Sequence, residues 1–138
     1  ELLVQARERR IEHWSKLSID EKYNRAKKCV YGEISCGQWS VIQSNAKLRK
    51  IQFDLLPKEA WDVWTRQDGK CALSGVVLNL KTIFEITASL DRIDSKLPYT
   101  KDNIQWVHKY LNIMKNQFSQ NDFIDMCILV AAKNLYNN

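Results

Sequence analysis

Helix-capping and turn residues divide this chain of 138 residues into short segments. Apolar residues that recur every three or four positions predict helices, and runs rich in β-branched and aromatic residues predict strands. The predicted helices span 2–17, 19–31, 38–50, 102–116, a segment that Pro57 opens and the turn at 68–69 ends, and a last segment capped at 119–122. The predicted strands span 51–55 and 83–93, with a hairpin at 71–80. This mixture predicts the α+β fold class.

No apolar run in the chain approaches 18 residues, and no signal segment opens it. The sequence therefore predicts a cytoplasmic protein that has no membrane partner. The four cysteines lack CxxC spacing, so they are predicted to be reduced thiols rather than a disulfide framework. The length corresponds to one domain that can bury a sizeable core.

The positive charge lies in the first third of the chain. Residues 1–50 hold 11 Lys and Arg against 6 Asp and Glu, whereas residues 51–138 hold 10 of each. A one-sided basic segment suggests a polyanion such as nucleic acid, and the alternative is a solvated helix face. On the predicted helix 38–50, the candidate DNA contacts are Lys47, Arg49 and Lys50. Trp39 on the same helix is expected to pack in the core rather than stack on a base.

Residues 69–115 contain the most informative polar side chains. A predicted strand places Asp91 near its end, and Asn112 lies in the helix predicted after it. A carboxylate and an amide oxygen suffice as ligands for Mg²⁺, which keeps several of its waters. The alternative is that Asp91 and Asp94 form turns and that Asn112 is a solvated helix residue.

The order of residues in this segment resembles the HNH endonucleases of the ββα-metal superfamily. The family pattern is C-x-x-C, then D-H, then N, then C-x-x-C-N-x-x-K, and the resemblance covers about residues 60–120. The corresponding residues here are Cys71-Ala-Leu-Ser74, Asp91-Arg92, Asn103, His108-Lys-Tyr-Leu111, Asn112 and Lys115. The order and spacing of so many positions are more specific than any one of them.

The resemblance implies a ββα-metal nuclease core with additional N-terminal helices and a C-terminal helix. It implies that Asp91 and Asn112 hold one Mg²⁺ or Mn²⁺. Asn103 is expected to brace the loop between strand and helix through hydrogen bonds from its side chain to the backbone. Lys115 is expected to touch phosphate or to stabilise the end of the helix.

The sequence departs from the family pattern first at the zinc knuckles. Only Cys71 and His108 of the four positions are zinc-capable, because Ser74 and Leu111 occupy the other two. A structural zinc needs four ligands, so no structural zinc is predicted and apolar packing is expected in its place. His108 is then expected to make hydrogen bonds rather than to bind metal.

The second departure is Arg92, which occupies the position of the general-base histidine of the family. Arginine stays protonated, so Arg92 is predicted to bind the scissile phosphate and not to accept a proton. The base stays open among His108, Tyr99, Glu85 and His13, with a metal-bound water as a further route to the nucleophile.

These observations predict an endonuclease that hydrolyses DNA phosphodiester bonds with the help of a metal. Residues 1–56 would form a basic helical region that contacts double-stranded DNA, and residues 57–138 the HNH-like core, within one compact unit. Cutting both strands would require a homodimer or two successive reactions. Two alternatives stay open: a catalytically inactive DNA-binding module of the same fold, and an RNA-directed nuclease or toxin.

Overall fold

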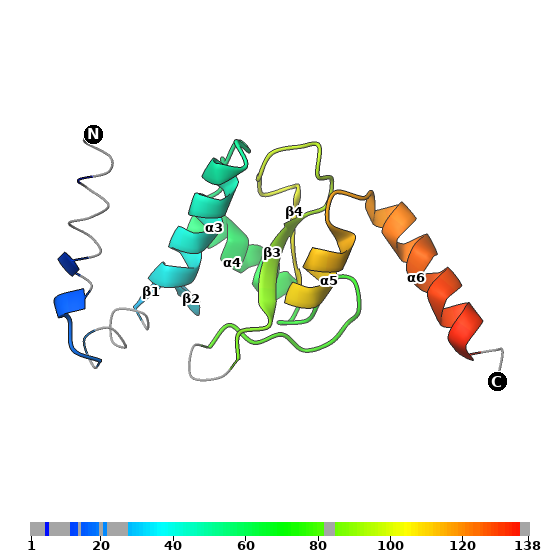
Figure 1. Ribbon diagram of the computed structural model, residues 1–138, viewed down its shortest axis with the longest axis horizontal. Coiled ribbons are helices and arrows are strands. Elements are labelled where there is room, and N and C mark those ends of the chain that lie inside the picture. Colours follow the sequence, from blue (N-terminus) through cyan, green and yellow to red (C-terminus); the bar gives the residue numbers. More distant parts are fainter. Residues whose placement is uncertain are drawn as a thin grey trace.

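The computed structural model describes residues 28–81 and 85–135, together with 5, 12, 13, 15–19 and 21. Over these residues the chain forms four helices and two small antiparallel sheets, so the α+β class is confirmed (Figure 1). Most of the residues of the helices predicted at 2–17 and 19–31 lie outside the described residues. The elements are β1 (Cys29–Tyr31), β2 (Ile34–Ser35), α3 (Cys36–Leu48), α4 (Pro57–Arg66), β3 (Ala88–Arg92), β4 (Ile104–His108), α5 (Lys109–Lys115) and α6 (Gln120–Leu135).

The first sheet is the hairpin of β1 and β2, so the predicted helix 19–31 is wrong at its C-terminal end. The turn between these strands contains Gly32 at φ 52°. A Cβ atom at this position would overlap the indole ring of Trp61 on α4. Glycine is therefore required for both its conformation and its lack of a side chain.

We expect Gly32→Ala to lower the free energy of unfolding by about 1–3 kcal/mol, since it adds steric overlap to a strained φ. Gly75→Ala is the matched control. Gly75 also has a positive φ, but a Cβ added there would meet no other atom. Urea denaturation of both variants measures the difference. Equal losses would show that the contact with Trp61 has no energetic role.

Helix α3 begins two residues before the predicted start because Ser35 and Gln38 form a capping box. The Ser35 hydroxyl accepts from the Gln38 N–H at 3.1 Å, and the Gln38 side chain accepts from the Ser35 N–H at 2.9 Å. Trp39 is buried and packs edge-on against Phe53, with ring centroids 5.5 Å apart. The prediction that Trp39 belongs to the core is confirmed.

Helix α4 begins with Pro57 at its first turn, as predicted. It ends at a turn in which Asp68 and Gly69 both have positive φ, which confirms the predicted stop. The predicted strand 51–55 is wrong, because that segment makes only one isolated bridge, between Phe53 and Tyr99. In place of the hairpin predicted at 71–80, the structure has one isolated antiparallel bridge, between Lys70 and Val77.

The second sheet pairs β3 with β4 in antiparallel register, with Asp91 opposite Gln105. The helix predicted at 102–116 is therefore wrong in its first half, which is β4. Ile104, Trp106 and Val107 are all buried, so the strand is covered on both faces and lacks the simple alternation that marks a strand in sequence. Helix α5 starts only after His108, whose Nδ1 accepts from the Tyr110 N–H at 3.3 Å.

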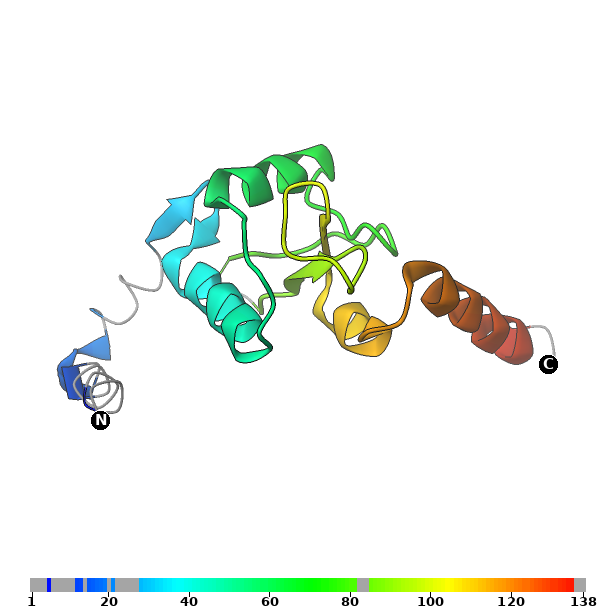
Figure 2. The ribbon, with the colours of Figure 1, turned by 90° about the horizontal axis from the view of Figure 1, so that it is seen from above.

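One hydrophobic core joins α3, α4 and the β3–β4 sheet, which lie around it in Figure 2. The indole N–H of Trp106 donates to the Ala60 carbonyl at 2.8 Å, and Trp64 packs edge-on against Trp106. Residues on both sides of position 56 belong to this core, from Trp39 to Val107. Helix α3, which carries Lys47, therefore shares a hydrophobic core with the β3–β4 sheet.

Helix α6 extends away from the rest of the described chain (Figures 1 and 2). Its start follows the prediction, since the Ser119 hydroxyl accepts from the Asp122 N–H at 3.1 Å. Its predicted core face is wrong, because only Phe123 is buried while Met126, Val130 and Leu135 are exposed. None of the helices in the described ranges is both long and apolar enough to cross a membrane.

Candidate functional site

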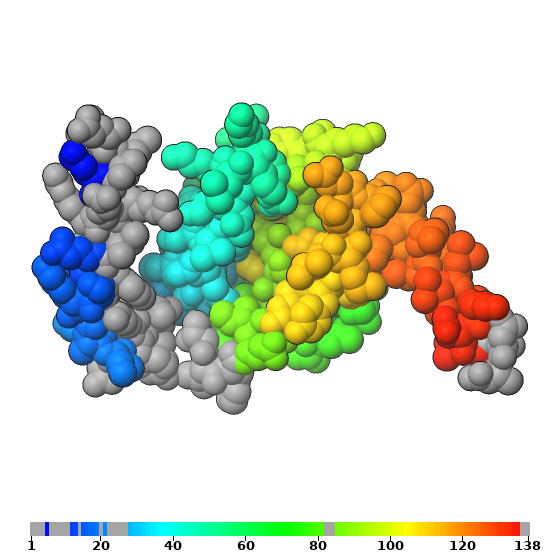
Figure 3. Space-filling model, in the orientation of Figure 1, coloured from blue at the N-terminus to red at the C-terminus, as the bar shows by residue number. Residues whose placement is uncertain are grey.

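A cavity of about 500 Å³ opens between α3, β3 and α5, and we call it the cleft. Figure 3 shows the face of the molecule on which α3 and α5 flank β3. Asp91 and Asn112, the two predicted metal ligands, both line it. Its other polar side chains are Ser35, Gln38, Asn45, Arg49, Ser89, Arg92, Ser95, Tyr99 and Asn116.

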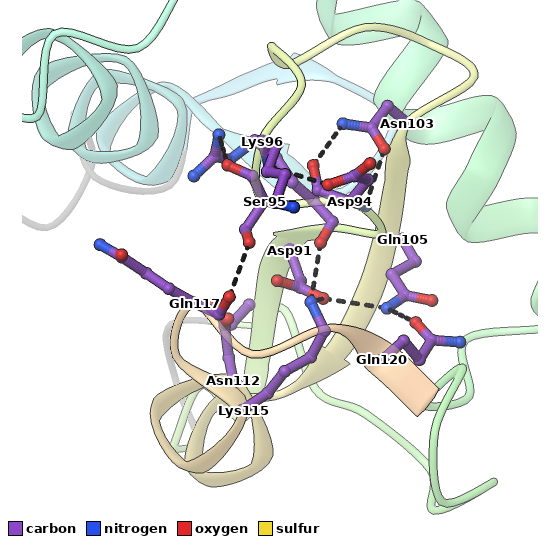
Figure 4. Close-up of polar contacts among 12 residues, drawn as sticks. Asp91, Asp94, Ser95, Lys96, Asn103, Gln105, Asn112, Lys115, Gln117 and Gln120 are labelled. Atoms are coloured by element: carbon purple, nitrogen blue, oxygen red, sulfur yellow. Dashed lines mark hydrogen bonds and ion pairs between the residues drawn. The ribbon is translucent and has the colours of Figure 1, made fainter. Parts of the chain in front are cut away.

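Asp91 lies on β3 with its carboxylate held at one oxygen. Its Oδ2 accepts from Lys115 Nζ at 2.9 Å and from Gln105 Nε2 at 2.9 Å. The other oxygen points away from both donors (Figure 4). The carboxylate is therefore oriented by two buried partners and keeps its second oxygen for another ligand.

Lys115 is fully buried, at 0% exposure, and also donates to the Arg92 carbonyl at 2.8 Å. Of the two roles expected for Lys115, contact with phosphate does not fit this geometry, because its ammonium points into the protein and pairs with Asp91. An ammonium buried among apolar residues needs such a partner to offset its desolvation. The Lys115 ammonium therefore influences the cleft by orienting the Asp91 carboxylate and by binding the Arg92 carbonyl of β3.

Gln105 links Asp91 to the start of α6, and sequence reasoning missed it. Its Nε2 donates both to Asp91 and to the Gln120 side chain, the latter at 2.8 Å. Gln105 is buried opposite Asp91 in the sheet. In the sequence, Gln105 is marked only as a glutamine within an apolar run. Its role as a partner of Asp91 follows once the segment is known to be a strand that pairs with β3.

Asn112 faces the same cleft from α5. Its Nδ2 donates to the Ser89 hydroxyl at 2.7 Å, which orients the amide and leaves its carbonyl oxygen as an acceptor. The described residues contain no group of three or more His, Cys, Asp or Glu placed to hold a metal. One carboxylate and one amide oxygen still match what Mg²⁺ takes from proteins, since it keeps most of its waters.

Arg92 follows Asp91 and lies where the cleft meets a second, basic groove. Its NH1 donates to the carbonyls of Ser95 and Leu97 at 2.7 and 2.8 Å, and its guanidinium lies over the Tyr99 ring at 5.3 Å. These contacts hold one edge of the planar guanidinium. Its remaining N–H groups are the donors that a phosphate would use.

Asn103 makes the expected side-chain to backbone hydrogen bonds, but the loop that it braces joins strands β3 and β4 and not a strand and a helix. The buried amide accepts from the Asp94 N–H at 2.9 Å and donates to the carbonyls of Asp94 and Pro98, both at 3.0 Å (Figure 4). Asn103 therefore shapes the loop that carries Ser95 and does not line the cleft.

The candidate bases are not equally placed. His108 pairs with Ala88, three positions along β3 from Asp91, which corresponds to about 10 Å of strand. The Lys109 hydrogen bond and charge hold the pKa of Glu85 below its usual range, and Glu85 lies outside the cleft. His13 is exposed and does not line it either. Only Tyr99 lines the cleft, and its hydroxyl accepts from Arg49 at 2.8 Å.

The residues at the knuckle positions form a hydrogen-bonded and apolar cluster. The buried Cys71 thiol accepts from the His108 N–H at 3.3 Å. Burial raises the pKa of Cys71, but hydrogen bonds from the Ser74 side chain and from the backbone of His108, Ser74 and Leu73 outweigh it, so the net pKa is lowered. Leu111 packs against the hydrophobic core. Cys71 is thus part of the core and Leu111 packs against it, while Ser74 and Leu111 line a shallow groove.

We expect purified protein to contain well under one zinc per chain, because Ser74 and Leu111 supply no zinc ligand. Elemental analysis by mass spectrometry measures this directly. Adding a chelator should leave the thermal midpoint unchanged. Stoichiometric zinc that is lost in Cys71→Ala would contradict the assignment of this cluster as metal-free.

The basic groove has a volume of about 620 Å³ and continues from the cleft past Arg92. Arg49, Lys50, Arg92 and Lys96 line it, without an acidic side chain among its lining residues. Lys47 does not line it, because it lies two residues from both Asn45 and Arg49 and so on the opposite side of α3. The predicted DNA-contacting set thus divides: Arg49 and Lys50 share a surface with the cleft, and Lys47 does not.

Comparison of this chain with protein-family models, with curated proteins and with solved structures gives no match in any of the three.

Proposed function

We propose that this protein is a metal-dependent endonuclease of HNH type that hydrolyses DNA phosphodiester bonds. The observation that carries the proposal is that one cleft contains Asp91, Asn112 and Arg92 and opens into a groove lined by four cations. A DNA backbone that followed the groove would bring a phosphate to the mouth of the cleft. The order of the motif residues from Cys71 to Lys115 supports the same proposal.

The free oxygen of Asp91 and the amide oxygen of Asn112 would hold Mg²⁺ or Mn²⁺. Such an ion supplies a water of lowered pKa and stabilises charge on the leaving oxygen. Lys115 and Gln105 keep the Asp91 carboxylate in its orientation, and Ser89 does the same for the Asn112 amide. Arg92 would donate to the phosphate that is cut.

No histidine or glutamate lines the cleft among the described residues. The proton of the attacking water would therefore pass to solvent, and a bound ion would favour its loss by lowering the pKa of that water. Tyr99 accepts a hydrogen bond from Arg49 at its hydroxyl, and the proposal assigns it no proton transfer. Arg92 stays protonated, so its role in this proposal is to donate hydrogen bonds to the phosphate and not to accept a proton.

The second candidate function is a DNA-binding module without catalysis. One observation favours it: Asp91 is already paired with a buried ammonium, which offsets the charge that would attract a divalent ion. Both candidates share the basic groove, and they differ only in what happens to the bound DNA.

The deciding experiment incubates supercoiled plasmid with the protein in Mg²⁺, in Mn²⁺, and in EDTA. The endonuclease proposal expects nicked or linear plasmid with either ion and intact plasmid in EDTA. Parallel reactions with RNA test the substrate class. Tight DNA binding without cleavage of DNA or RNA under any ion would replace the nuclease proposal by the binding module.

We expect the double variant Arg49→Gln, Lys50→Gln to weaken DNA binding and to flatten its salt dependence. Each phosphate contact contributes about 0.9 to the slope of log affinity against log salt, so the slope should fall by about 2. Lys47→Gln is the control, because it removes one positive charge from the far side of α3 and should leave the slope nearly unchanged. Fluorescence anisotropy with a labelled duplex at several salt concentrations measures both. Equal slopes for the double variant and the control would exclude the groove as the DNA path.

A further inference from the structure

Helix α6 exposes more apolar surface than a helix on the edge of a monomer normally does. Phe123 is its single buried residue, while Met126, Leu129 and Val130 are 59%, 62% and 60% exposed. A helix that is apolar on most sides is usually enclosed on most sides. The described residues cover only its first turns.

Two faces of α6 can be distinguished. The inner face lies over the body of the protein, where Phe123, Ile124, Cys127 and Ile128 line an apolar groove together with Leu73 and Leu111. The outer face points the opposite way and carries Asp122, Met126, Leu129 and Lys133, which we call the outer stripe. Its spacing of four, three and four residues places all four side chains along one line of the helix.

We propose that the outer stripe binds the same stripe of a second copy of this chain, with the two helices antiparallel. The stripe is ordered acidic, apolar, apolar, basic, and it is symmetric about its centre. When two copies run in opposite directions, Asp122 lies opposite Lys133 of the partner subunit, and Met126 lies opposite Leu129 of the partner subunit. A two-fold axis requires such a self-complementary surface.

The charges favour this orientation over a parallel one. Parallel helices would place two Asp122 carboxylates at one end and two Lys133 ammonium groups at the other. Antiparallel helices pair them at both ends, where each charge also complements a helix dipole. The same order of side chains would not arise as a match to an arbitrary protein surface.

The contact would be small. The stripe covers three helical turns, about 16 Å. Together with Val130 and the flanking side chains, two copies would bury on the order of 800–1,000 Å², near the lower limit for specific interfaces. Buried area does not convert directly into affinity, so we expect only that the dimer is weak and reversible. The inference does not depend on the proposed nuclease activity.

Sedimentation equilibrium of the chain, at concentrations from about 5 μM to 500 μM, is the test. The mass should rise from the 16.2 kDa of the monomer towards twice that value. Leu129→Glu should hold the protein at the monomer mass at every concentration. The control is Leu135→Glu, which introduces the same change on the same helix at a site that is 70% exposed and off the outer stripe.

Charge reversal tests the orientation. Asp122→Lys and Lys133→Glu should each weaken the dimer at least about tenfold, and the double variant should restore it, because it recreates both opposite-charge pairs. Circular dichroism verifies that α6 stays helical in each variant. A monomer at all concentrations, equal loss in Leu129→Glu and Leu135→Glu, or no recovery in the double variant would each overturn the proposal.

Discussion

Asn112→Ala and Asp91→Asn are each expected to reduce plasmid cleavage by at least about 10²–10³-fold, the scale for losing one electrostatic stabiliser of a transition state. The two side chains face one cleft from β3 and α5 and supply the two oxygens of the proposed metal site. DNA affinity measured in EDTA should change less than about threefold, since neither residue lines the basic groove. Initial rates of nicking in Mg²⁺ are the measurement.

Asn45→Ala is the matched control for Asn112→Ala. Asn45 is also an asparagine in the cleft, but it lies on α3, across from β3. Its removal should change the rate less than about tenfold. If Asn45→Ala and Asn112→Ala cut equally well, Asn112 does not belong to the metal site. Undiminished cutting by Asp91→Asn would exclude the proposed mechanism.

Lys115→Met should lower the free energy of unfolding by about 3–5 kcal/mol, because it leaves the buried Asp91 carboxylate without its cationic partner. The ammonium is 2.9 Å from Asp91 Oδ2, and both side chains are buried. Methionine keeps the length and apolar stem of lysine, so the loss reports the charge rather than a cavity. Urea denaturation measures it.

Two further variants separate the ion pair from other effects. Lys109→Met on the same helix removes an exposed ion pair with Glu85 and should leave the urea midpoint nearly unchanged. The double variant Lys115→Met, Asp91→Asn removes both buried charges and should recover much of the lost stability. A double variant that loses the sum of the two single losses would show that the two groups are not coupled.

The Asp91 carboxylate connects the stability of the fold to the chemistry of the cleft. One of its oxygens belongs to a buried network with Lys115, Gln105 and, beyond it, Gln120. The other oxygen faces away from that network (Figure 4). Asp91→Asn therefore has to be assayed for folding as well as for cleavage, whereas Asn112→Ala affects a side chain whose hydrogen-bond partner is the single hydroxyl of Ser89.

Asp91, Arg92 and Asn112 could be proposed from the sequence because their order resembles a known motif. Gln105 and Ser89 could not, because their contribution is to hold another side chain in place. Such a role depends on strand register and helix packing, which a linear order does not contain.

Local signals located several element boundaries correctly. Pro57 opens α4, Asp68 and Gly69 end it, and Ser119 caps α6, because each acts through its own backbone or that of residues a few positions away. The prediction failed at strand β4 because four residues in succession are buried there. Such a run lacks the alternation of a half-buried strand, so periodicity alone cannot tell it from a buried helix.

The sequence by itself determined the α+β class, the turns, the caps and the identity of the polar residues in the motif, since these follow from backbone preferences and side-chain chemistry over short distances. Tertiary structure alone decided that Lys115 is buried against Asp91, that Lys47 faces away from the groove, and that the outer stripe of α6 is exposed. The physical reason is that the sequence around a charged or apolar residue is the same whether its side chain contacts solvent or protein. Its environment is set by the elements that pack beside it.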